Sequence, residues 1–108
     1  MNDEKTTIGI NGLAHVILTV SDFEKAHEFY SKLLPRFGMS LIHDGPDFCY
    51  HVGGRTAIGI RRCDPEYANE RFQQYRVGLH HLCFRARTME DVDETAILVS
   101  KLGAKIVP

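Results

Sequence analysis

The sequence has little net charge, no long apolar run and few cysteines, and each shortage excludes a class of protein. Its 13 basic and 14 acidic side chains nearly cancel, so no long-range field attracts nucleic acid or an anionic membrane. No apolar run approaches the roughly 20 residues of a membrane span. Residues 1–12 lack the basic region and apolar core of a signal peptide. We therefore expect neither a nucleic-acid partner nor a membrane partner.

The scarce cysteines bear on location and stability. Cys49, Cys63 and Cys83 are odd in number and form no close pair, so we expect neither a disulfide framework nor a thiolate metal site. A reducing cytoplasm is then the expected location. With 108 residues, of which 44% are hydrophobic and 25% charged, the chain suits one globular domain over residues 1–108.

A repeat organises this domain. GLHHLCFRA, residues 78–86, matches GLAHVILTV, residues 12–20, with identical Gly, Leu and His at the same places. The matched histidines are His15 and His81. Two copies at so long a period do not make a solenoid, and they indicate two copies of one supersecondary unit.

The first copy predicts a strand followed by a helix. Residues 12–20 are rich in β-branched side chains, which is typical of a half-buried strand. Ser21, with Glu24 three residues later, forms a capping box at which a helix should begin. Pro35 weakens this helix near its end, and Gly38 is the expected stop. Helical spacing predicts a buried face of Phe23, Ala26, Tyr30, Leu33 and Phe37.

Three further strands are expected in the first copy, over residues 39–45, 47–52 and 55–62. The last two form a hairpin, because Gly53 and Gly54 suit the positive-φ positions of a tight turn. The first module then spans residues 12–63, and polar residues 64–77, which begin with Asp-Pro, link it to the second copy.

The second module covers residues 78–108 and repeats the strand and the helix. Thr88 with Asp91 should begin this helix, and Gly103 should end it. Its predicted buried face consists of Met89, Val92, Ala96, Val99 and Leu102. The module reaches only the start of its next strand, so we expect its closing strands beyond residue 108 or from a partner.

Strand alternation then gives His15 a direction. It places Leu13, His15, Ile17 and Thr19 on one face, and Ala14, Val16, Leu18 and Val20 on the other. The all-apolar set should face the helix, which leaves His15 on the opposite, concave side of the sheet. Repeat equivalence puts His81 on the same side, and a pseudo-twofold axis would make the two converge.

Two interpretations of the histidine pair stay open. Imidazole is the commonest side-chain ligand for metals such as Zn, Fe, Ni and Mn, so equivalent histidines suggest a shared divalent metal site. Alternatively, both are inherited, metal-free histidines that hydrogen-bond in a pocket. The other histidines, His27, His43 and His51, are expected to be surface or packing residues.

The paired modules, the G-L-x-H strand openings and the V-S-D-F-E-K-A-x-E-F-Y stretch at residues 20–30 resemble the vicinal oxygen chelate superfamily. That group includes glyoxalase I, extradiol dioxygenases, fosfomycin-resistance proteins and bleomycin-binding proteins. The resemblance covers residues 12–107. It implies an α+β fold in which paired βαβββ modules form a cupped mixed sheet. It also implies a small-molecule substrate and a homodimer, often with modules paired across chains.

The resemblance implies metal ligands on the first and last strands of each module. The first-strand positions match His15 and His81, whereas the last strand of the first module offers Gly59, which has no side chain to coordinate. This departure favours a set of two histidines and one carboxylate, with the carboxylate expected beyond residue 108.

Pairing across the predicted hairpin puts Phe48, Tyr50, Ala57, Gly59 and Arg61 on one face. If that face is concave, Tyr50 contacts the substrate and Arg61 pairs with an anionic group, unless Arg61 is simply solvated beside Arg62. The small residue at position 59 would leave room for a bulkier substrate.

Two functions follow from these residues. The first is a metal-dependent glyoxalase- or dioxygenase-like enzyme, a lyase or a dioxygenase, whose metal binds oxygens of a small substrate. The alternative is a metal-free protein of the bleomycin-resistance type that binds or sequesters a small molecule. The sequence singles out no general base, substrate or metal, because fold does not fix function.

Overall fold

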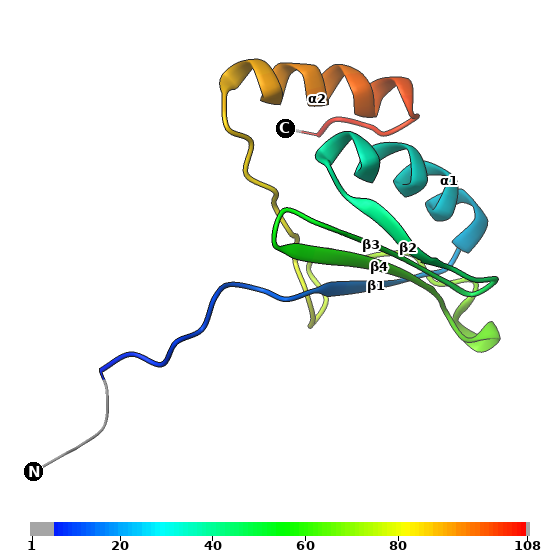
Figure 1. The fold of residues 1–108 in the computed structure, drawn as a ribbon. Helices are drawn as coiled ribbons and strands as arrows, with labels where there is room; N and C mark the ends of the chain where they lie inside the picture. The colour runs from blue at the N-terminus through cyan, green and yellow to red at the C-terminus, as the bar shows by residue number, and fades with distance from the viewer. Residues whose placement is uncertain (1–5, 108) are drawn as a thin grey trace, which may run out of the picture.

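A mixed four-stranded sheet carries one helix on one of its faces, and a second helix lies beyond the first (Figure 1). The computed structural model describes residues 6–107, which leaves residues 1–5 and 108 of the predicted domain outside the description. The strands are β1 (Val16–Val20), β2 (Ser40–Asp44), β3 (Phe48–Gly53) and β4 (Thr56–Arg62). The helices are α1 (Phe23–Leu33) and α2 (Met89–Lys101), with short 3₁₀ helices η1 (Leu34–Phe37) and η2 (Pro65–Tyr67). The predicted α+β class is confirmed.

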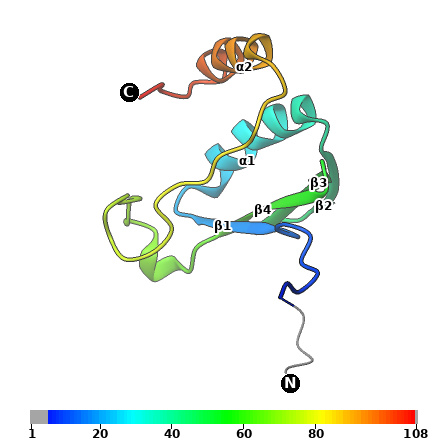
Figure 2. The same ribbon diagram turned by 90° about the vertical axis from the view of Figure 1, so that its left-hand side faces the viewer.

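The sheet has the strand order β1-β4-β3-β2, in which β1 is parallel to β4 and the other pairs are antiparallel. The connection from β1 passes through α1, which covers one face of the sheet (Figure 2). The core between that face and α1 consists of Phe23, Leu34, Met39, Cys49, Ile58 and Ile60. In the described part of the chain no helix is long and apolar enough to cross a membrane.

The predicted faces of β1 are confirmed. Val16, Leu18 and Val20 pack against the core, whereas Ile17 and Thr19 point away from it and are exposed. The strand itself is shorter than the predicted 12–20, because its ladder with β4 begins only at Val16. His15 therefore lies directly before β1 rather than inside it.

Helix α1 begins one residue later than the predicted capping box. The cap is Asp22, whose carboxylate accepts the backbone N–H of Lys25 at 3.2 Å, and not Ser21. A carboxylate is favoured there because it also faces the positive end of the helix dipole. The predicted end is confirmed: the chain tightens into η1 around Pro35 and stops at Gly38, which has a φ of 79°.

The hairpin turn lies one residue after its predicted place. Gly54 and Arg55, with φ of 60° and 64°, form the turn, and Gly53 ends β3. Gly53 is needed for a different reason. A Cβ there would lie 2.5 Å from the carbonyl oxygen of Gly38 and 2.8 Å from the Cα of Met39, so only glycine lets the two backbones approach.

The second copy departs from the prediction in its strands. Residues 78–86, the predicted first strand, form no strand pairing, and neither do residues 104–107, the predicted start of the next. In the first copy β1 has one neighbour in the sheet, the parallel strand β4. The described second copy contains no counterpart of β4, so the backbone of residues 78–86 has no ladder to join.

Helix α2 forms where it is predicted but is not buried. Thr88 caps its start through a 3.1 Å hydrogen bond, and Gly103, with a φ of 95°, follows its end. The predicted buried face is wrong, since α2 has no buried residue and Met89 is 72% exposed. No sheet lies under α2 in the described residues. An ion pair between Arg36 and Glu94, at 3.0 Å, joins α2 to the first copy.

Candidate ligand-binding face

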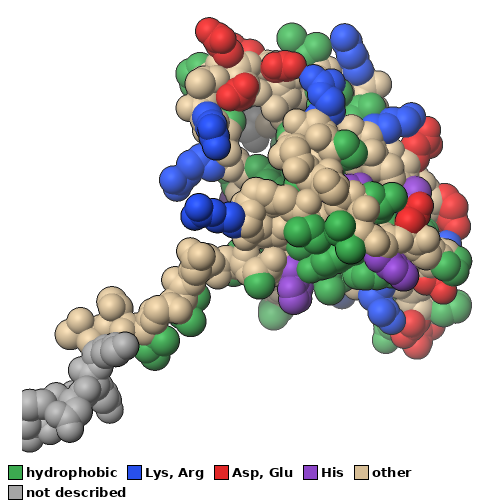
Figure 3. All heavy atoms as spheres, viewed as in Figure 1, with side chains coloured by type: hydrophobic (Ala, Val, Ile, Leu, Met, Phe, Trp, Pro, Cys, Tyr) green, Lys and Arg blue, Asp and Glu red, His purple; other side chains and the backbone are tan. Residues whose placement is uncertain are grey.

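The sheet has a second face that α1 does not cover, here called the open face. The strand register places on it His15, Ile17, Thr19, Ser40, His43, Phe48, Tyr50, Val52, Ala57, Gly59 and Arg61. None of these side chains is acidic. In Figure 3 histidine and apolar side chains lie side by side over the strands, below the helices. The predicted substrate residues thus do share one face, because moving the turn by one residue shifts the pairing by two and preserves the alternation.

A row of four rings runs across the open face. The centroids of His43 and Phe48 are 5.9 Å apart, those of Phe48 and Tyr50 5.8 Å, and those of Tyr50 and His15 6.3 Å. Phe48 and Tyr50 are nearly parallel, with an interplanar angle of 27°. Both are half-buried, while the two histidines at the ends are exposed.

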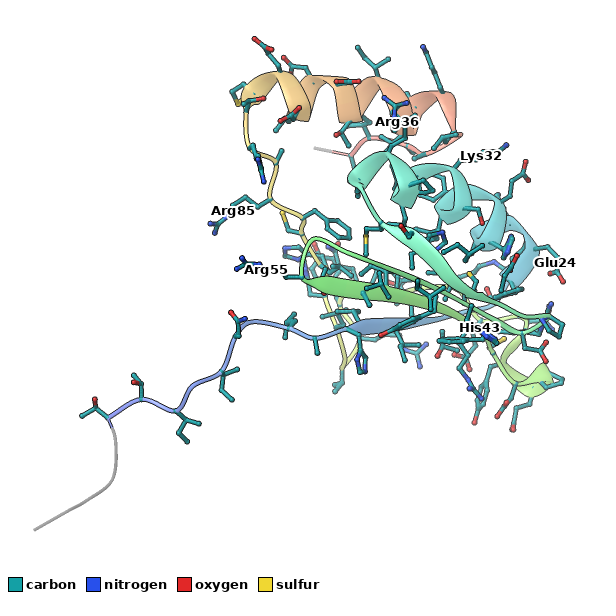
Figure 4. All side chains as sticks on the ribbon, viewed as in Figure 1. Glu24, Lys32, Arg36, His43, Arg55 and Arg85 are labelled. Carbon is teal, nitrogen blue, oxygen red and sulfur yellow. The ribbon has the colours of Figure 1, made fainter. Side chains whose placement is uncertain are left out.

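His43 was expected to be a surface or packing residue, and it is exposed, but its place on the open face was not predicted. Leu41 lies opposite His51 on the face toward α1, but a bulge follows, and His43 lies opposite Tyr50 on the open face. A bulge adds one residue to a strand and reverses the alternation after it. Nothing in the local sequence marks that extra residue. Figure 4 shows His43 at the end of the sheet away from the Arg55 turn.

The prediction that the small residue at position 59 leaves room for a bulkier substrate is wrong, because another side chain occupies that space. A Cβ at this position would lie 2.9 Å from Cε1 of Phe48 and 3.1 Å from Cγ1 of Ile17. The ring of Phe48 therefore lies across β4 at Gly59 and fills the volume that a side chain would take. The glycine gives room to Phe48, and the ligand would meet that ring.

Two consecutive arginines end β4 with opposite surroundings. Arg62 bonds to Glu24 at 2.6 Å and to Asp47 at 2.8 Å, and its guanidinium lies 4.9 Å from the centre of the Phe23 ring. The hydrogen bond from Arg62 holds the pKa of Glu24 below its usual value. Arg61 points to the open face, is exposed and has no ion pair within the described residues. Its charge is available to an external anion.

The two predicted metal ligands have different neighbours. His15 is exposed beside the Tyr50 ring. Nδ1 of His81 lies 2.7 Å from Nδ1 of His80. The same Nδ1 of His80 lies 3.2 Å from the side-chain amide nitrogen of Gln74. With that amide donating, Nδ1 of His80 accepts and Nδ1 of His81 carries the proton, so Nε2 of His81 keeps its lone pair. Among residues 6–107 no three His, Cys, Asp or Glu side chains gather as a metal centre.

A polar cluster lies on the other side of the sheet, under α1. Nε2 of His27 is 2.7 Å from a carboxylate oxygen of Asp44. His51 is 1% exposed, and its Nδ1 has no hydrogen-bond partner. Burial lowers the pKa of His51, as does the neighbouring His27, while Asp44 opposes the shift. His51 was expected to be a surface or a packing residue, and the structure shows that it is a packing residue.

The fold and the open face define a class before any relative is considered: a βαβββ unit with one uncovered sheet face suited to a small ligand. The model of the Glyoxalase/Bleomycin resistance protein/Dioxygenase superfamily matches residues 12–108, and the chain belongs to this superfamily. A comparison with curated proteins finds no match.

Solved structures agree with this assignment. The chain is 26% identical to a candidate glyoxalase from Bacillus halodurans, with a TM-score of 0.77 over 85% of this chain and 69% of that one. It is 27% identical to the fosfomycin resistance protein FosX of Listeria monocytogenes, whose variant structure contains Mn(II) and 1S,2S-dihydroxypropylphosphonic acid, with a TM-score of 0.62 over 92% and 70% of the two chains. Lactoylglutathione lyase from Agrobacterium tumefaciens shares the fold at 20% identity, with a TM-score of 0.59 over 88% and 72%.

Proposed function

We propose that this chain binds a small oxygenated molecule on its open face and acts on it as a metal-dependent lyase or dioxygenase, with His15 and His81 as protein ligands of a divalent metal. The observation that carries the proposal is His15, an exposed imidazole at the start of β1 beside Tyr50. Imidazole nitrogen suits Fe, Mn, Zn and Ni. The Mn(II) and the phosphonic acid bound by the Listeria monocytogenes relative support this class of ligand.

The residues present fit such a metal in part. His15 and Nε2 of His81 are suitable nitrogen donors, and a third donor is not found within residues 6–107. A bound divalent metal would act as a Lewis acid toward substrate oxygens. The contribution of the chain itself is to bind and orient: Tyr50 contacts the substrate, and Arg61 pairs with its anionic group. We also expect a cytoplasmic homodimer with modules paired across chains.

A metal-free binding protein of the bleomycin-resistance type is the second candidate. The incomplete donor set and the row of rings favour it, because stacking on Phe48 and Tyr50 requires no metal. The two candidates differ in one measurable property. Ligand binding by the enzyme depends on a chelatable metal, whereas ligand binding by the second protein does not.

Metal uptake tests the first candidate directly. The purified chain is stripped with a chelator, dialysed against Mn(II), Zn(II), Ni(II) or anaerobic Fe(II), and assayed for bound metal. We expect about one metal per site in the wild type and little in the His15→Ala/His81→Ala double variant. His43→Ala is the control, since it removes an exposed histidine outside the proposed pair. Equal uptake by the wild type and the double variant would contradict the enzyme and favour the metal-free protein.

A further inference from the structure

We propose that the open face selects a planar aromatic carboxylate, whose ring stacks on Phe48 and Tyr50 and whose charge pairs with Arg61. This inference names the substrate class of the proposed site and rests on the proposed function only for the location of that site. It applies to both the enzyme and the metal-free binding protein.

The first support is the shape of the ring row. Phe48 and Tyr50 are nearly parallel, with ring centroids 5.8 Å apart and an interplanar angle of 27°, and their half-buried rings lie between exposed histidines. The parts of the two rings that face solvent give the open face an apolar aromatic surface. Flat conjugated ligands cover such a surface more completely than puckered or branched ones, and offset stacking adds to the area that they bury.

The second support is that the sheet makes room for this surface. Position 59, opposite Tyr50 in β3 and Ile17 in β1, is a glycine. A Cβ there would lie 2.9 Å from the Phe48 ring, so the ring would have to shift. Glycine at position 59 therefore lets the Phe48 ring lie over β4.

The third support is the charge. Arg61 lies directly opposite Phe48 in the antiparallel ladder, which puts the two Cβ atoms roughly 5 Å apart. It is the one fixed charge on the open face, and it makes no ion pair within the described residues. A carboxylate on a ring stacked over Phe48 is therefore within reach of the guanidinium, which binds carboxylates with two parallel hydrogen bonds.

The probe for this proposal is 2-naphthoate, titrated into the full chain in the presence of a chelator and followed by its own fluorescence. The chain contains no tryptophan, so excitation of the probe meets little protein background. We expect saturable binding with a Kd of about 1 mM or below. We expect a roughly tenfold weakening in Arg61→Gln, which loses a charged pairing, and a roughly fivefold weakening in Tyr50→Leu.

Matched control variants distinguish binding at the proposed site from binding elsewhere on the surface. Arg55→Gln removes an exposed arginine at the other end of β4, which points away from the sheet in Figure 4, and Tyr75→Leu removes an 85% exposed tyrosine of the linker. Both should bind the probe within twofold of the wild type. Cyclohexanecarboxylate, which is not planar, and uncharged 2-naphthamide should each displace the probe poorly. Circular dichroism spectra and melting curves confirm that every variant is folded.

Absence of saturable binding, or equal weakening in the site variants and their controls, would overturn the aromatic carboxylate. Displacement of the probe by cyclohexanecarboxylate at concentrations near the Kd of the probe would overturn it too. Because the chelator is present throughout, these outcomes are independent of metal uptake. If the probe binds but the chain takes up no metal, the aromatic carboxylate stands and the metal-dependent enzyme is contradicted. If the chain takes up metal but does not bind the probe, the enzyme stands and the aromatic carboxylate is contradicted.

Discussion

The two copies of the repeat begin with the same residues and end in different states. The first copy, residues 12–63, builds a four-stranded sheet with α1 packed on it, and its core residues are almost completely buried. The second copy has a helix with a proper cap and stop, yet its described residues, 78–107, form no strand and α2 has no buried residue. Caps and stops act within one turn of the chain, whereas strands and buried faces require a partner. The comparison separates what is local from what is not.

The largest expected contrast comes from the same truncation in each copy. Leu34→Ala removes a fully buried side chain from the core under the sheet and should lower the free energy of unfolding by about 2–5 kcal/mol. Leu98→Ala, in the partly exposed face of α2, should cost less than about 1 kcal/mol. Urea unfolding followed by circular dichroism measures both. Similar losses in the two variants would mean that α2 is as well packed as the first copy.

A smaller effect is expected at the close backbone approach. Gly53→Ala places a Cβ against the backbone of Gly38 and Met39, which cannot move aside as a side chain can, and should destabilise the fold by about 1–3 kcal/mol. Gly9→Ala is the matched control, because nothing lies within 4 Å of the added Cβ. If Gly53→Ala melts at the wild-type temperature, the hairpin and the residues after η1 do not approach as described.

The two helix caps should have equal chemistry and unequal consequences. Asp22→Ala removes the cap of α1 and should lower the free energy of unfolding by about 1 kcal/mol, because α1 unfolds with the sheet. Thr88→Ala removes an equivalent 3.1 Å bond at α2 and should reduce helix content while leaving the main unfolding transition in place. Hydrogen exchange at individual backbone amides measures the protection of each helix separately. A shared loss of protection in Thr88→Ala would show that α2 folds together with the first copy.

The stability of the fold should fall at acid pH through His51. Because the folded-state pKa of His51 is lowered by burial and by His27, the unfolded chain binds the proton more readily. This contribution to stability is complete above the unfolded value near 6.5, and it is lost as the pH falls from there toward the folded-state pKa. Asp44, from β2, is the other charged group that acts on it, and it opposes the shift.

Melting temperatures between pH 7.5 and 5 test this sign. His51→Leu should flatten the acid side of the curve relative to the wild type, whereas His43→Leu, which changes an exposed histidine, should keep the wild-type slope. A His51→Leu curve that falls as steeply as that of the wild type would assign the loss to other groups.

Much of the first copy could be predicted because its signals are local. The spacing of Phe23, Ala26 and Tyr30 gives the buried face of α1, and the alternation in β1 gives the face that carries His15 and Ile17. The shared face of the predicted substrate residues also survives a turn placed one residue away, since a two-residue shift in pairing preserves the alternation.

The errors share one physical cause, which is the need for a partner. His43 reaches the open face through a bulge between β2 and β3, a property of their pairing. In the sequence, Gly59 shows only that a metal-ligating side chain is missing. In the structure, the ring of Phe48 from the neighbouring strand occupies the space next to it. Residues 78–86 have the composition of a strand and no strand to pair with.

The sequence by itself determined the two helices, their stops, the alternation of β1, β3 and β4 and the family, because these depend on residues within a turn or a pleat of one another. Only the tertiary structure decided which face is open, which arginine is unpaired, how the rings align, and which strand-like segment remains unpaired. Each of these depends on contacts between atoms of different strands. Residues so far apart along the chain leave no local sequence pattern that predicts such contacts.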